Sequence, residues 1–283
     1  MNNLLKSFES LYYRVKLLFN IKHINIEETG VNEEGPFVKL KNGFVFYGIP
    51  TREKQYKYYS LLSKKYKQLI KIETLQTVYD IIIRFVERGL RLGGPRKEMF
   101  YNLKEGDVVA EMGAYMGHYT LYLSEKVGQN GRIIAIEPLP DNLHYLRTNI
   151  EKNNIENVTI VPKGVWSEKR KLTFSRKQHD HQSASLILND SEKEKTEIDV
   201  DKLDNILMDA NVESVDFMII QLNGVELEAL EGLTKIKPKN ISIAARYDKD
   251  KTKTSKKIKQ LLEKRNYNVK IINKDYVFAK LND

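Results

Sequence analysis

Cysteine is absent from this chain of 283 residues. Its absence excludes disulfides, cysteine-based metal sites and thiol chemistry. Long apolar runs are absent too, because no stretch approaches the ~20 apolar residues that a membrane-spanning helix needs. The amino-terminal apolar stripe is interrupted by Lys6, Arg14 and Lys16 and lacks a small-residue cleavage site, so no secretory signal is predicted. These absences predict a cytoplasmic protein without a transmembrane segment.

Charge of one sign is in surplus. The sequence holds 47 Lys and Arg residues against 38 Asp and Glu residues, which gives a formal net charge of +9 at pH 7. Such a surplus favours acidic partners. The sequence has no dense block of Arg and Lys with interleaved aromatic residues, however, which is the pattern expected of an RNA groove. A nucleic-acid partner is therefore possible but not favoured.

Residues 1–93 have a helical rhythm with one interruption. Apolar residues recur at spacings of three and four, which predicts amphipathic helices, at Leu4, Phe8, Leu11, Tyr12, Val15 and Leu18, and again at 58–69 and 75–86. Between them, Phe37 to Tyr47 reads as a hairpin around Asn42-Gly43, since both residues tolerate a positive φ. We expect a mainly helical N-terminal region that forms a cap or an oligomer contact, so the protein is a possible homo-oligomer.

Residues 94–283 alternate between short apolar strands and helices. This alternation predicts βαβ units and a parallel sheet covered on both faces, which is an α/β fold. The expected strands are Val108–Glu111, Arg132–Glu137, Asn157–Pro162, Val215–Leu222 and Ile241–Arg246, with an irregular stretch between Pro162 and Val215. The segments Asn268–Ile272 and Tyr276–Lys280 read as a closing antiparallel hairpin.

A glycine loop follows the first of these strands. It reads EMGAYMG, from Glu111 to Gly117, and leads into a helix. Gly113 would let the backbone turn sharply and approach a ligand, and Gly117 would let the helix start close to the strand. The dinucleotide fingerprint has a further glycine for the approach to a pyrophosphate. Since that glycine is missing here, the loop favours a cofactor without a pyrophosphate.

An acidic residue ends the second strand at the spacing that a nucleoside site requires. Glu137 follows Gly117 by 20 residues (137 − 117), close to the offset of the carboxylate that binds ribose hydroxyls. A carboxylate at this place can accept hydrogen bonds from both hydroxyls of an adenosine ribose. Strand, loop, helix, strand and carboxylate together predict a nucleoside-cofactor site.

Several segments resemble the FkbM family of methyltransferases. They are GDVVAEMGAYMGHYTLYLSE, GRIIAIEPLPDNLHYLRTNIEKNNIENVTIV, SASL at Ser183–Leu186, VDKLDNIL at Val200–Leu207 and VDFMIIQLNGVELEALEGL at Val215–Leu233. The resemblance covers roughly Glu98 to Ile243. It implies a Rossmann-like class I methyltransferase fold with a mostly parallel seven-stranded sheet, S-adenosylmethionine as cofactor, and O-methylation of a hydroxyl group.

The resemblance also implies roles for single residues. The methionine side of the cofactor would lie against Glu111, Gly113, Tyr115 and Gly117, and the ribose would bind Glu137. The adenine would lie near Pro162 to Val165, and Pro138 and Gly164 are further candidate cofactor residues. The sequence departs from the family at two places. Glu111 stands where the family usually has Asp. The fourth-strand motif, usually Lys-Ile-Asp-Val-Glu-Gly, here reads Ile-Ile-Gln-Leu-Asn-Gly, so that Gln221 and Asn223 replace carboxylates.

Methyl transfer to oxygen requires placement of the acceptor and removal of a proton. His118, directly after the glycine loop, is the candidate base, although a surface histidine at a helix start is an equally good interpretation. Gln221 and Asn223 could orient a hydroxyl group by hydrogen bonding. Alternatively, Asn223 and Gly224 form an ordinary turn between strand and helix.

One cluster invites a metal interpretation, namely His179-Asp180-His181. No helical spacing or fourth ligand supports it, so no metal site is predicted and a polar loop is favoured. The leading hypothesis is an O-methyltransferase that acts on a hydroxyl of a sugar, a glycan or a small molecule. The alternatives are a methyltransferase-like binding protein that has lost catalysis and an RNA methyltransferase.

Overall fold

The computed structural model describes residues 25–50, 71–81, 97–177, 193–245, 248–249 and 252–283. The chain separates into two compact units. Unit 1 comprises residues 1–93 together with 148–154, and unit 2 comprises residues 94–147 and 155–283.

The described part of unit 1 is built on a three-stranded antiparallel sheet. Its strands β1 (Ile26–Asn32), β2 (Gly35–Leu40) and β3 (Val45–Tyr47) are adjacent in chain order. The 3-10 helix η2 (Ile72–Thr74) and the helix α3 (Leu75–Ile81) follow, and they bury an apolar face together with the sheet, formed by Val38, Phe46, Leu75, Val78 and Ile81.

The hairpin predicted at Asn42-Gly43 is confirmed, with Gly43 at a φ of 93°. The first strand was not predicted, and the described part of residues 1–93 is richer in strand than the expected helical region. The helices predicted at residues 4–18 and 58–69 lie outside the described residues.

Unit 2 contains a seven-stranded sheet in the order β14-β15-β11-β10-β4-β5-β6. The neighbours from β11 to β6 are parallel, and β15 is antiparallel to both of its neighbours. The strands are β4 (Val108–Met112), β5 (Arg132–Ile136), β6 (Val158–Val161), β10 (Phe217–Ile220), β11 (Asn240–Ala244), β14 (Tyr267–Ile272) and β15 (Tyr276–Leu281). The predicted parallel sheet with a closing antiparallel hairpin is confirmed.

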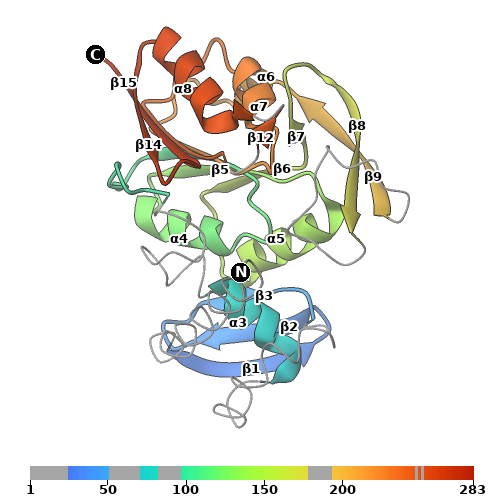
Figure 1. Ribbon diagram of the computed structural model, residues 1–283. Helices are drawn as coiled ribbons and strands as arrows, with labels where there is room; N and C mark the ends of the chain where they lie inside the picture. The colour runs from blue at the N-terminus through green and yellow to red at the C-terminus, as the bar shows by residue number, and fades with distance from the viewer. Residues whose placement is uncertain (1–24, 51–70, 82–96, 178–192, 246–247, 250–251) are drawn as a thin grey trace, which may run out of the picture. The chain divides into compact units, whose positions relative to one another are not determined.

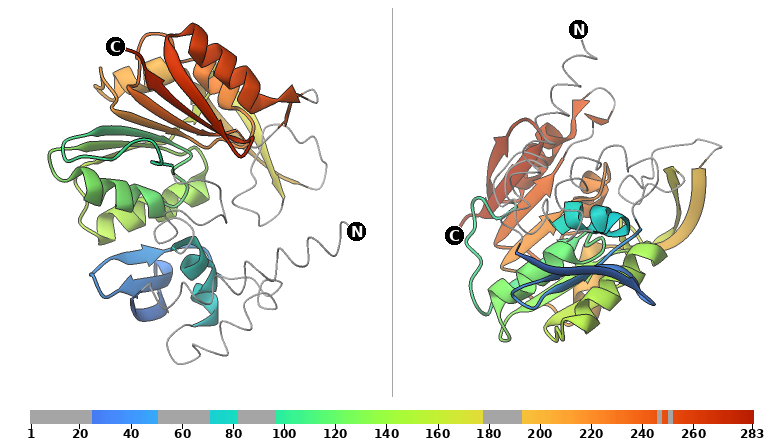
Figure 2. Two further views of the ribbon diagram at one scale, coloured as in Figure 1. Left: turned by 60° about the vertical axis from the view of Figure 1, so that its left-hand side comes forward. Right: turned by 90° about the horizontal axis from the view of Figure 1, so that it is seen from below.

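Helices cover both faces of this sheet (Figure 1; Figure 2). On one face lie α4 (His118–Val127) and α5 (Pro140–Lys152), and on the other lie α6 (Leu203–Asp209), α7 (Glu226–Glu231) and α8 (Thr254–Lys264). All four residues of β10 are buried, as are four of the five residues in each of β4 and β5. This burial explains why these strands are nearly continuous apolar runs instead of alternating ones.

The stretch between β6 and β10, expected to be irregular, contains a second sheet. Its strands β7 (Gly164–Val165), β8 (Arg170–Lys177) and β9 (Lys193–Asp201) pair in the order β7-β9-β8. The expectation was wrong because β8 and β9 carry so many charged residues that their apolar positions, such as Leu172 and Ile198, are sparse. A further short pair joins β12 (Asp248–Lys249) to β13 (Thr252–Lys253).

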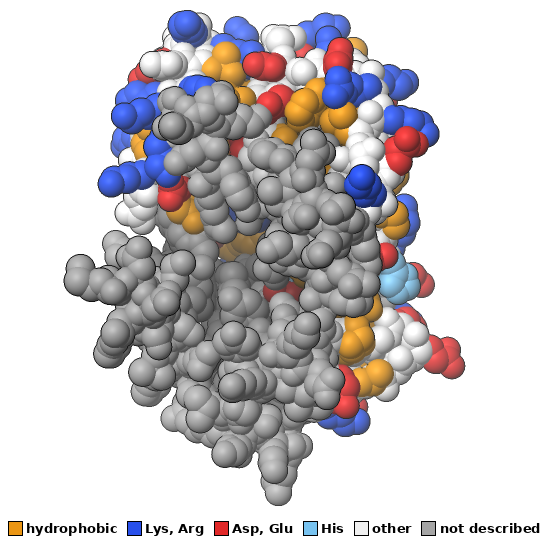
Figure 3. Space-filling view, turned by 45° about the vertical axis from the view of Figure 1, so that its right-hand side comes forward, with side chains coloured by type: hydrophobic (Ala, Val, Ile, Leu, Met, Phe, Trp, Pro, Cys, Tyr) orange, Lys and Arg blue, Asp and Glu red, His pale blue; other side chains and the backbone are white. Residues whose placement is uncertain are grey.

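Figure 3 shows the charged side chains on one face of the molecule. On the face shown in Figure 3, Lys and Arg side chains are scattered, with Asp and Glu side chains between them. Within the described ranges, no helix combines the length and the apolar character that crossing a membrane requires. The cytoplasmic location stays a prediction.

Candidate cofactor site

The order of strands in unit 2 reverses between β4 and β10. After β4 the chain continues to β5 and β6 on one side, and then returns to place β10 on the other side of β4. In open parallel sheets, ligands bind beyond the carboxyl ends of the strands at such a reversal. The glycine loop leaves β4 at this point, and Gln221 to Gly224 leave β10 beside it.

Gly113 lies directly against the second of these loops, at Gln221. Its φ is 81°, and a β-carbon built on it would lie only 2.3 Å from the backbone oxygen of Gln221. Its N–H and the N–H of Ala114 both donate to the backbone oxygen of Ile136, at 2.9 and 3.1 Å. The glycine predicted to allow approach of a ligand is thus also required by the protein's own backbone.

The loop turns twice more in the left-handed region. Tyr115 has a φ of 57° and Gly117 a φ of 81°. Tyr115 therefore adopts a backbone conformation that favours glycine. A tyrosine thus stands where the dinucleotide fingerprint has its further glycine, and the backbone still makes the turn. A β-carbon on Gly117 would lie 2.6 Å from the Leu146 side chain of α5. Gly117 thus permits close packing against α5, whereas the sequence suggested packing against the strand.

Glu137 links the end of β5 to the glycine loop. Its side chain is 4% exposed, and its Oε2 accepts a hydrogen bond from the N–H of Tyr115 at 2.9 Å. Its Oε1 accepts from the N–H of Leu139 and from Nδ2 of Asn142, each at 3.1 Å. The carboxylate is therefore held in a fixed orientation at the carboxyl end of the sheet.

Asn142 was not singled out from the sequence. It lies in the first turn of α5 and is 2% exposed, and its Oδ1 makes no hydrogen bond to any described residue. The position of an amide five residues after Glu137, on the first turn of a helix, was the available signal. A fixed carboxylate beside an unpaired buried acceptor suits a ligand with neighbouring hydroxyl donors, so these residues fit a ribose.

Glu111 lies in a buried polar network. One carboxylate oxygen accepts from Thr120 Oγ1 at 2.7 Å, and the other lies 3.3 Å from Lys97 Nζ. The same lysine lies over the Tyr119 ring, 4.0 Å from its centroid. Burial and then the Glu98 carboxylate raise the pKa of Tyr119 well above its ordinary value, so its hydroxyl stays protonated and donates to Glu98. These contacts give Glu111 a role in joining β4, α4 and the segment at residue 97.

The other predicted cofactor residues lie near the same edge of the sheet. Gly164 begins β7, where a β-carbon would lie 2.8 Å from the side chains of Ile198 and Val200. Its lack of a side chain is thus explained by packing against β9. Pro138 directly follows Glu137 and is half-buried. The cofactor roles of both residues stay predictions.

The three candidate catalytic residues are placed differently. His118 is the first residue of α4 and is completely buried, so the interpretation as a surface histidine is wrong. Its ring centroid lies 6.4 Å from that of Tyr115. Gln221 and Asn223 are partly exposed beyond β10, and Asn223 has a φ of 53°. The structure therefore leaves the two amides partly exposed and buries His118 at the start of α4.

Glu226 is a carboxylate that follows the last residue of the fourth-strand motif, Gly224, by two positions. It is completely buried at the start of α7, and its Oε1 accepts from the N–H of Gly224 at 3.1 Å. Burial raises the pKa of Glu226, although hydrogen bonds from backbone N–H groups partly offset this effect. The side chain closes the turn that carries Asn223 and Gly224.

Metal coordination has no support among the described residues, where no group of three or more His, Cys, Asp or Glu side chains could hold an ion. His179, Asp180 and His181 lie outside the described residues.

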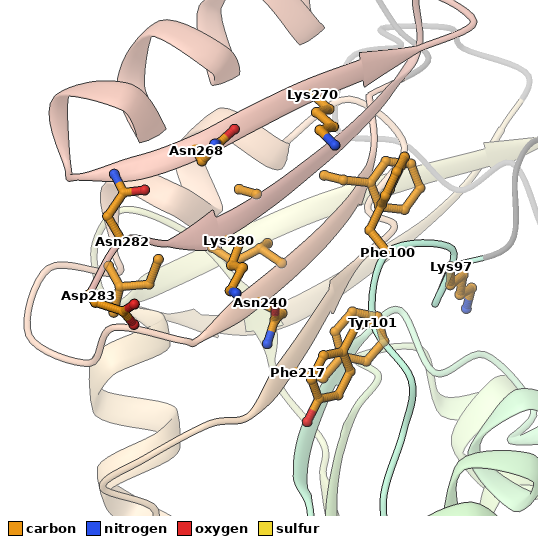
Figure 4. Close-up of a pocket in the computed structure, with 14 residues that line it drawn as sticks. Lys97, Phe100, Tyr101, Phe217, Asn240, Asn268, Lys270, Lys280, Asn282 and Asp283 are labelled. Carbon is orange, nitrogen blue, oxygen red and sulfur yellow. The ribbon is translucent and has the colours of Figure 1, made fainter.

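A cavity of about 330 Å³ lies elsewhere in unit 2, beside the amino ends of β10 and β11 and the C-terminal hairpin (Figure 4). The rings of Phe100 and Phe278 lie 4.9 Å apart in its wall, and Tyr101 stacks on Phe217 at 5.2 Å. Its lining includes none of the predicted cofactor residues. The cavity is therefore separate from the candidate cofactor site.

Comparison with known proteins identifies the family. Residues 107–269 match the model of the methyltransferase FkbM domain, which is more than half of the chain. The chain belongs to the FkbM methyltransferase family. The resemblance drawn from the sequence is thus confirmed, and the cofactor is S-adenosyl-L-methionine.

Similarity to individual proteins is more limited. The chain is 35% identical over 60 residues to a protein-L-isoaspartate O-methyltransferase of Methanococcus aeolicus, a match that covers 21% of this chain and 28% of that relative. The chain thus spans less than a third of the length of that relative.

Two solved structures are also similar. One is the FkbM methyltransferase of Methylobacillus flagellatus (16% identity, 80% of this chain, 60% of that chain, TM-score 0.47). The other is Aeropyrum pernix fibrillarin with bound S-adenosyl-L-methionine (12% identity, 90% of this chain, 98% of that chain, TM-score 0.42).

Proposed function

We propose that this protein is an O-methyltransferase that transfers the methyl group of S-adenosylmethionine to a hydroxyl of a sugar, a glycan or a small molecule. One observation carries the proposal. At the reversal of strand order, the loop that bears Gly113 lies against the backbone of Gln221, and the N–H of Tyr115 is hydrogen-bonded to Glu137. The candidate cofactor residues and the residues proposed to orient the methyl-accepting hydroxyl therefore lie together at the carboxyl ends of the strands.

Glu137 would bind the ribose of the cofactor. Its carboxylate is held by three donors from the protein, so it need not reorganise when a ligand arrives. The loop from Gly113 to Gly117 would lie along the methionine part. Glu111 would support that loop from behind, since its two oxygens lie against Thr120 and Lys97.

The sulfonium of the bound cofactor supplies an electrophilic methyl group. The protein's task is then to hold a hydroxyl oxygen in line and to receive its proton. Gln221 and Asn223 are neutral amides that can donate to and accept from a hydroxyl group. His118 stays the candidate base from the sequence; it is completely buried at the start of α4, directly after the loop, and its access to the acceptor hydroxyl is part of the proposal.

Transfer of a labelled methyl group tests the proposal. The protein is incubated with methyl-labelled cofactor and, separately, with pools of glycans, small hydroxyl compounds and RNA. We expect label on the hydroxyl groups of one of the first two pools. We expect Asn223→Ala to reduce the rate about tenfold or more while cofactor affinity stays within twofold, since one oriented hydrogen bond is removed.

Two other outcomes would contradict the proposal. Cofactor binding without transfer to any pool would favour the alternative of a binding protein that has lost catalysis. The neutral side chains of Gln221 and Asn223 are the observation that suggests this alternative. Transfer to RNA alone would favour the RNA methyltransferase. A role of residues 1–93 as a cap or an oligomer contact stays a prediction.

A further inference from the structure

Asn142 is a buried amide that is hydrogen-bonded to the Glu137 carboxylate. Its Nδ2 donates to Oε1 of Glu137 at 3.1 Å, and the N–H of Leu139 donates to the same oxygen at 3.1 Å. The amide and the carboxylate are thus joined directly, and a displacement of one side chain displaces the other.

The contact with Glu137 also decides how the amide is oriented. If the amide were turned by 180°, Oδ1 would face Oε1 of Glu137, and two acceptors would repel each other. With Nδ2 directed to Glu137, Oδ1 is buried and has no hydrogen-bond partner among the described residues. Folded proteins rarely leave a buried carbonyl oxygen unpaired, because its lost hydration is not replaced.

The usual structural uses of asparagine do not account for Asn142. It is not the N-cap of α5, because that helix begins at Pro140. Inside a helix, asparagine is a poor choice, because its side chain competes for backbone hydrogen bonds. Asn142 is 2% exposed, and its unpaired Oδ1 belongs to an amide that is hydrogen-bonded to Glu137, the proposed ribose-binding residue. A hydrogen-bond donor that arrives with the cofactor explains this unpaired oxygen better.

We propose that Asn142 is a second ribose-binding residue. Its Oδ1 accepts a hydrogen bond from one ribose hydroxyl of S-adenosylmethionine, and the Glu137 carboxylate accepts from the other. The inference rests on the proposed function, in which Glu137 binds the ribose. The pair Glu137–Asn142 then selects ribose over deoxyribose, because each hydroxyl has its own acceptor.

Calorimetry with three ligands tests this inference. S-adenosylhomocysteine and its 2′-deoxy and 3′-deoxy analogues are titrated into the wild type and into Asn142→Ala. We expect the variant to bind S-adenosylhomocysteine about tenfold more weakly, as for the loss of one hydrogen bond. We expect the wild type and the variant to bind one of the deoxy analogues within twofold of each other. Equal weakening for all three ligands, or unchanged affinity for S-adenosylhomocysteine, would overturn the inference.

Control variants separate binding from folding. Asn142→Leu keeps the volume without the amide and repeats the comparison if Asn142→Ala does not fold, which thermal unfolding without ligand would show. Asn130→Ala removes an exposed amide and should leave all three affinities unchanged. If the wild type itself does not bind S-adenosylhomocysteine, the proposed function fails. If it binds and Asn142→Ala binds equally well, only this inference fails.

Discussion

Gly113 and Gly106 both have a left-handed backbone conformation, with φ values of 81° and 87°, so substitutions at the two positions can be compared directly. A β-carbon at Gly106 would meet nothing within 4 Å, whereas one at Gly113 would lie 2.3 Å from a backbone oxygen. Gly106→Ala should therefore cost only the backbone strain, about 1 kcal/mol. Gly113→Ala should cost at least about 2 kcal/mol more, because a backbone atom must move.

Denaturant unfolding measures both free energies. Gly113→Ala should also weaken the binding of S-adenosylhomocysteine, since the displaced loop is the proposed cofactor loop, while Gly106→Ala should bind as the wild type does. Equal destabilisation by the two substitutions would show that the close approach to Gln221 is not important for the fold.

Single residues were predicted from the sequence only where their type restricts the backbone or the charge. Gly113 and Glu137 were singled out in this way, and their roles in binding the cofactor stay predictions. The left-handed conformation of Tyr115 was not, because tyrosine rarely adopts it and only the surrounding fold imposes it. Asn142 was missed because its residue type does not show that its amide is buried beside a carboxylate, and only its position five residues after Glu137 pointed to it.

At the scale of elements, Asp204 fastens α6 to the segment after α7. One of its oxygens accepts from the N–H groups of Thr234 and Lys235 at 2.7 and 2.9 Å, and the other from that of Ile236 at 3.0 Å. Burial would raise the pKa of Asp204, but these hydrogen bonds outweigh it and hold the pKa below the ordinary value. Asp204→Asn should lower the free energy of unfolding at pH 7 by about 2 kcal/mol, because an amide N–H₂ would face backbone donors.

The pH dependence of this effect has a definite sign. The folded state lowers the pKa of Asp204, so its stabilisation is complete above the ordinary carboxyl pKa of about 4 and is lost as the pH falls through the lowered value. The difference in the free energy of unfolding between the wild type and Asp204→Asn should therefore become smaller below about pH 4. Asp209→Asn, at an exposed position of α6, serves as the control. A difference that is constant from pH 3 to pH 7 would contradict the assignment.

Elements were predicted best where burial dominates their composition. The parallel sheet was predicted from the nearly continuous apolar runs of β4, β5, β10 and β11, which are apolar because both faces of these strands are covered. The charged strands β8 and β9 carried no such pattern, since pairing with each other, and not burial, defines them. The order of the strands in the sheet was not predicted, because the periodicity of a strand contains no information about which strand lies beside it.

For the whole molecule, cofactor binding should appear as added stability. A ligand at 100 times its Kd stabilises the folded state by about 2.7 kcal/mol. For a domain of this size, each kcal/mol raises Tm by about 2–4 °C. Scanning calorimetry with S-adenosylhomocysteine should therefore shift the transition in which unit 2 unfolds. If the two units unfold separately, a shift confined to the transition of unit 1 would contradict the assignment of the site.

The central claim is that Glu137 and the loop from Glu111 to Gly117 hold S-adenosylmethionine. Titration calorimetry of the wild type, Glu137→Ala and the exposed control Glu125→Ala with S-adenosylhomocysteine tests it most directly. We predict one site per chain in the wild type and in Glu125→Ala with the same Kd. For Glu137→Ala, whose fold is checked by thermal unfolding, we predict a Kd at least about tenfold higher, because charged hydrogen bonds to the ribose are lost. Equal affinity of a folded Glu137→Ala and the wild type would contradict the account.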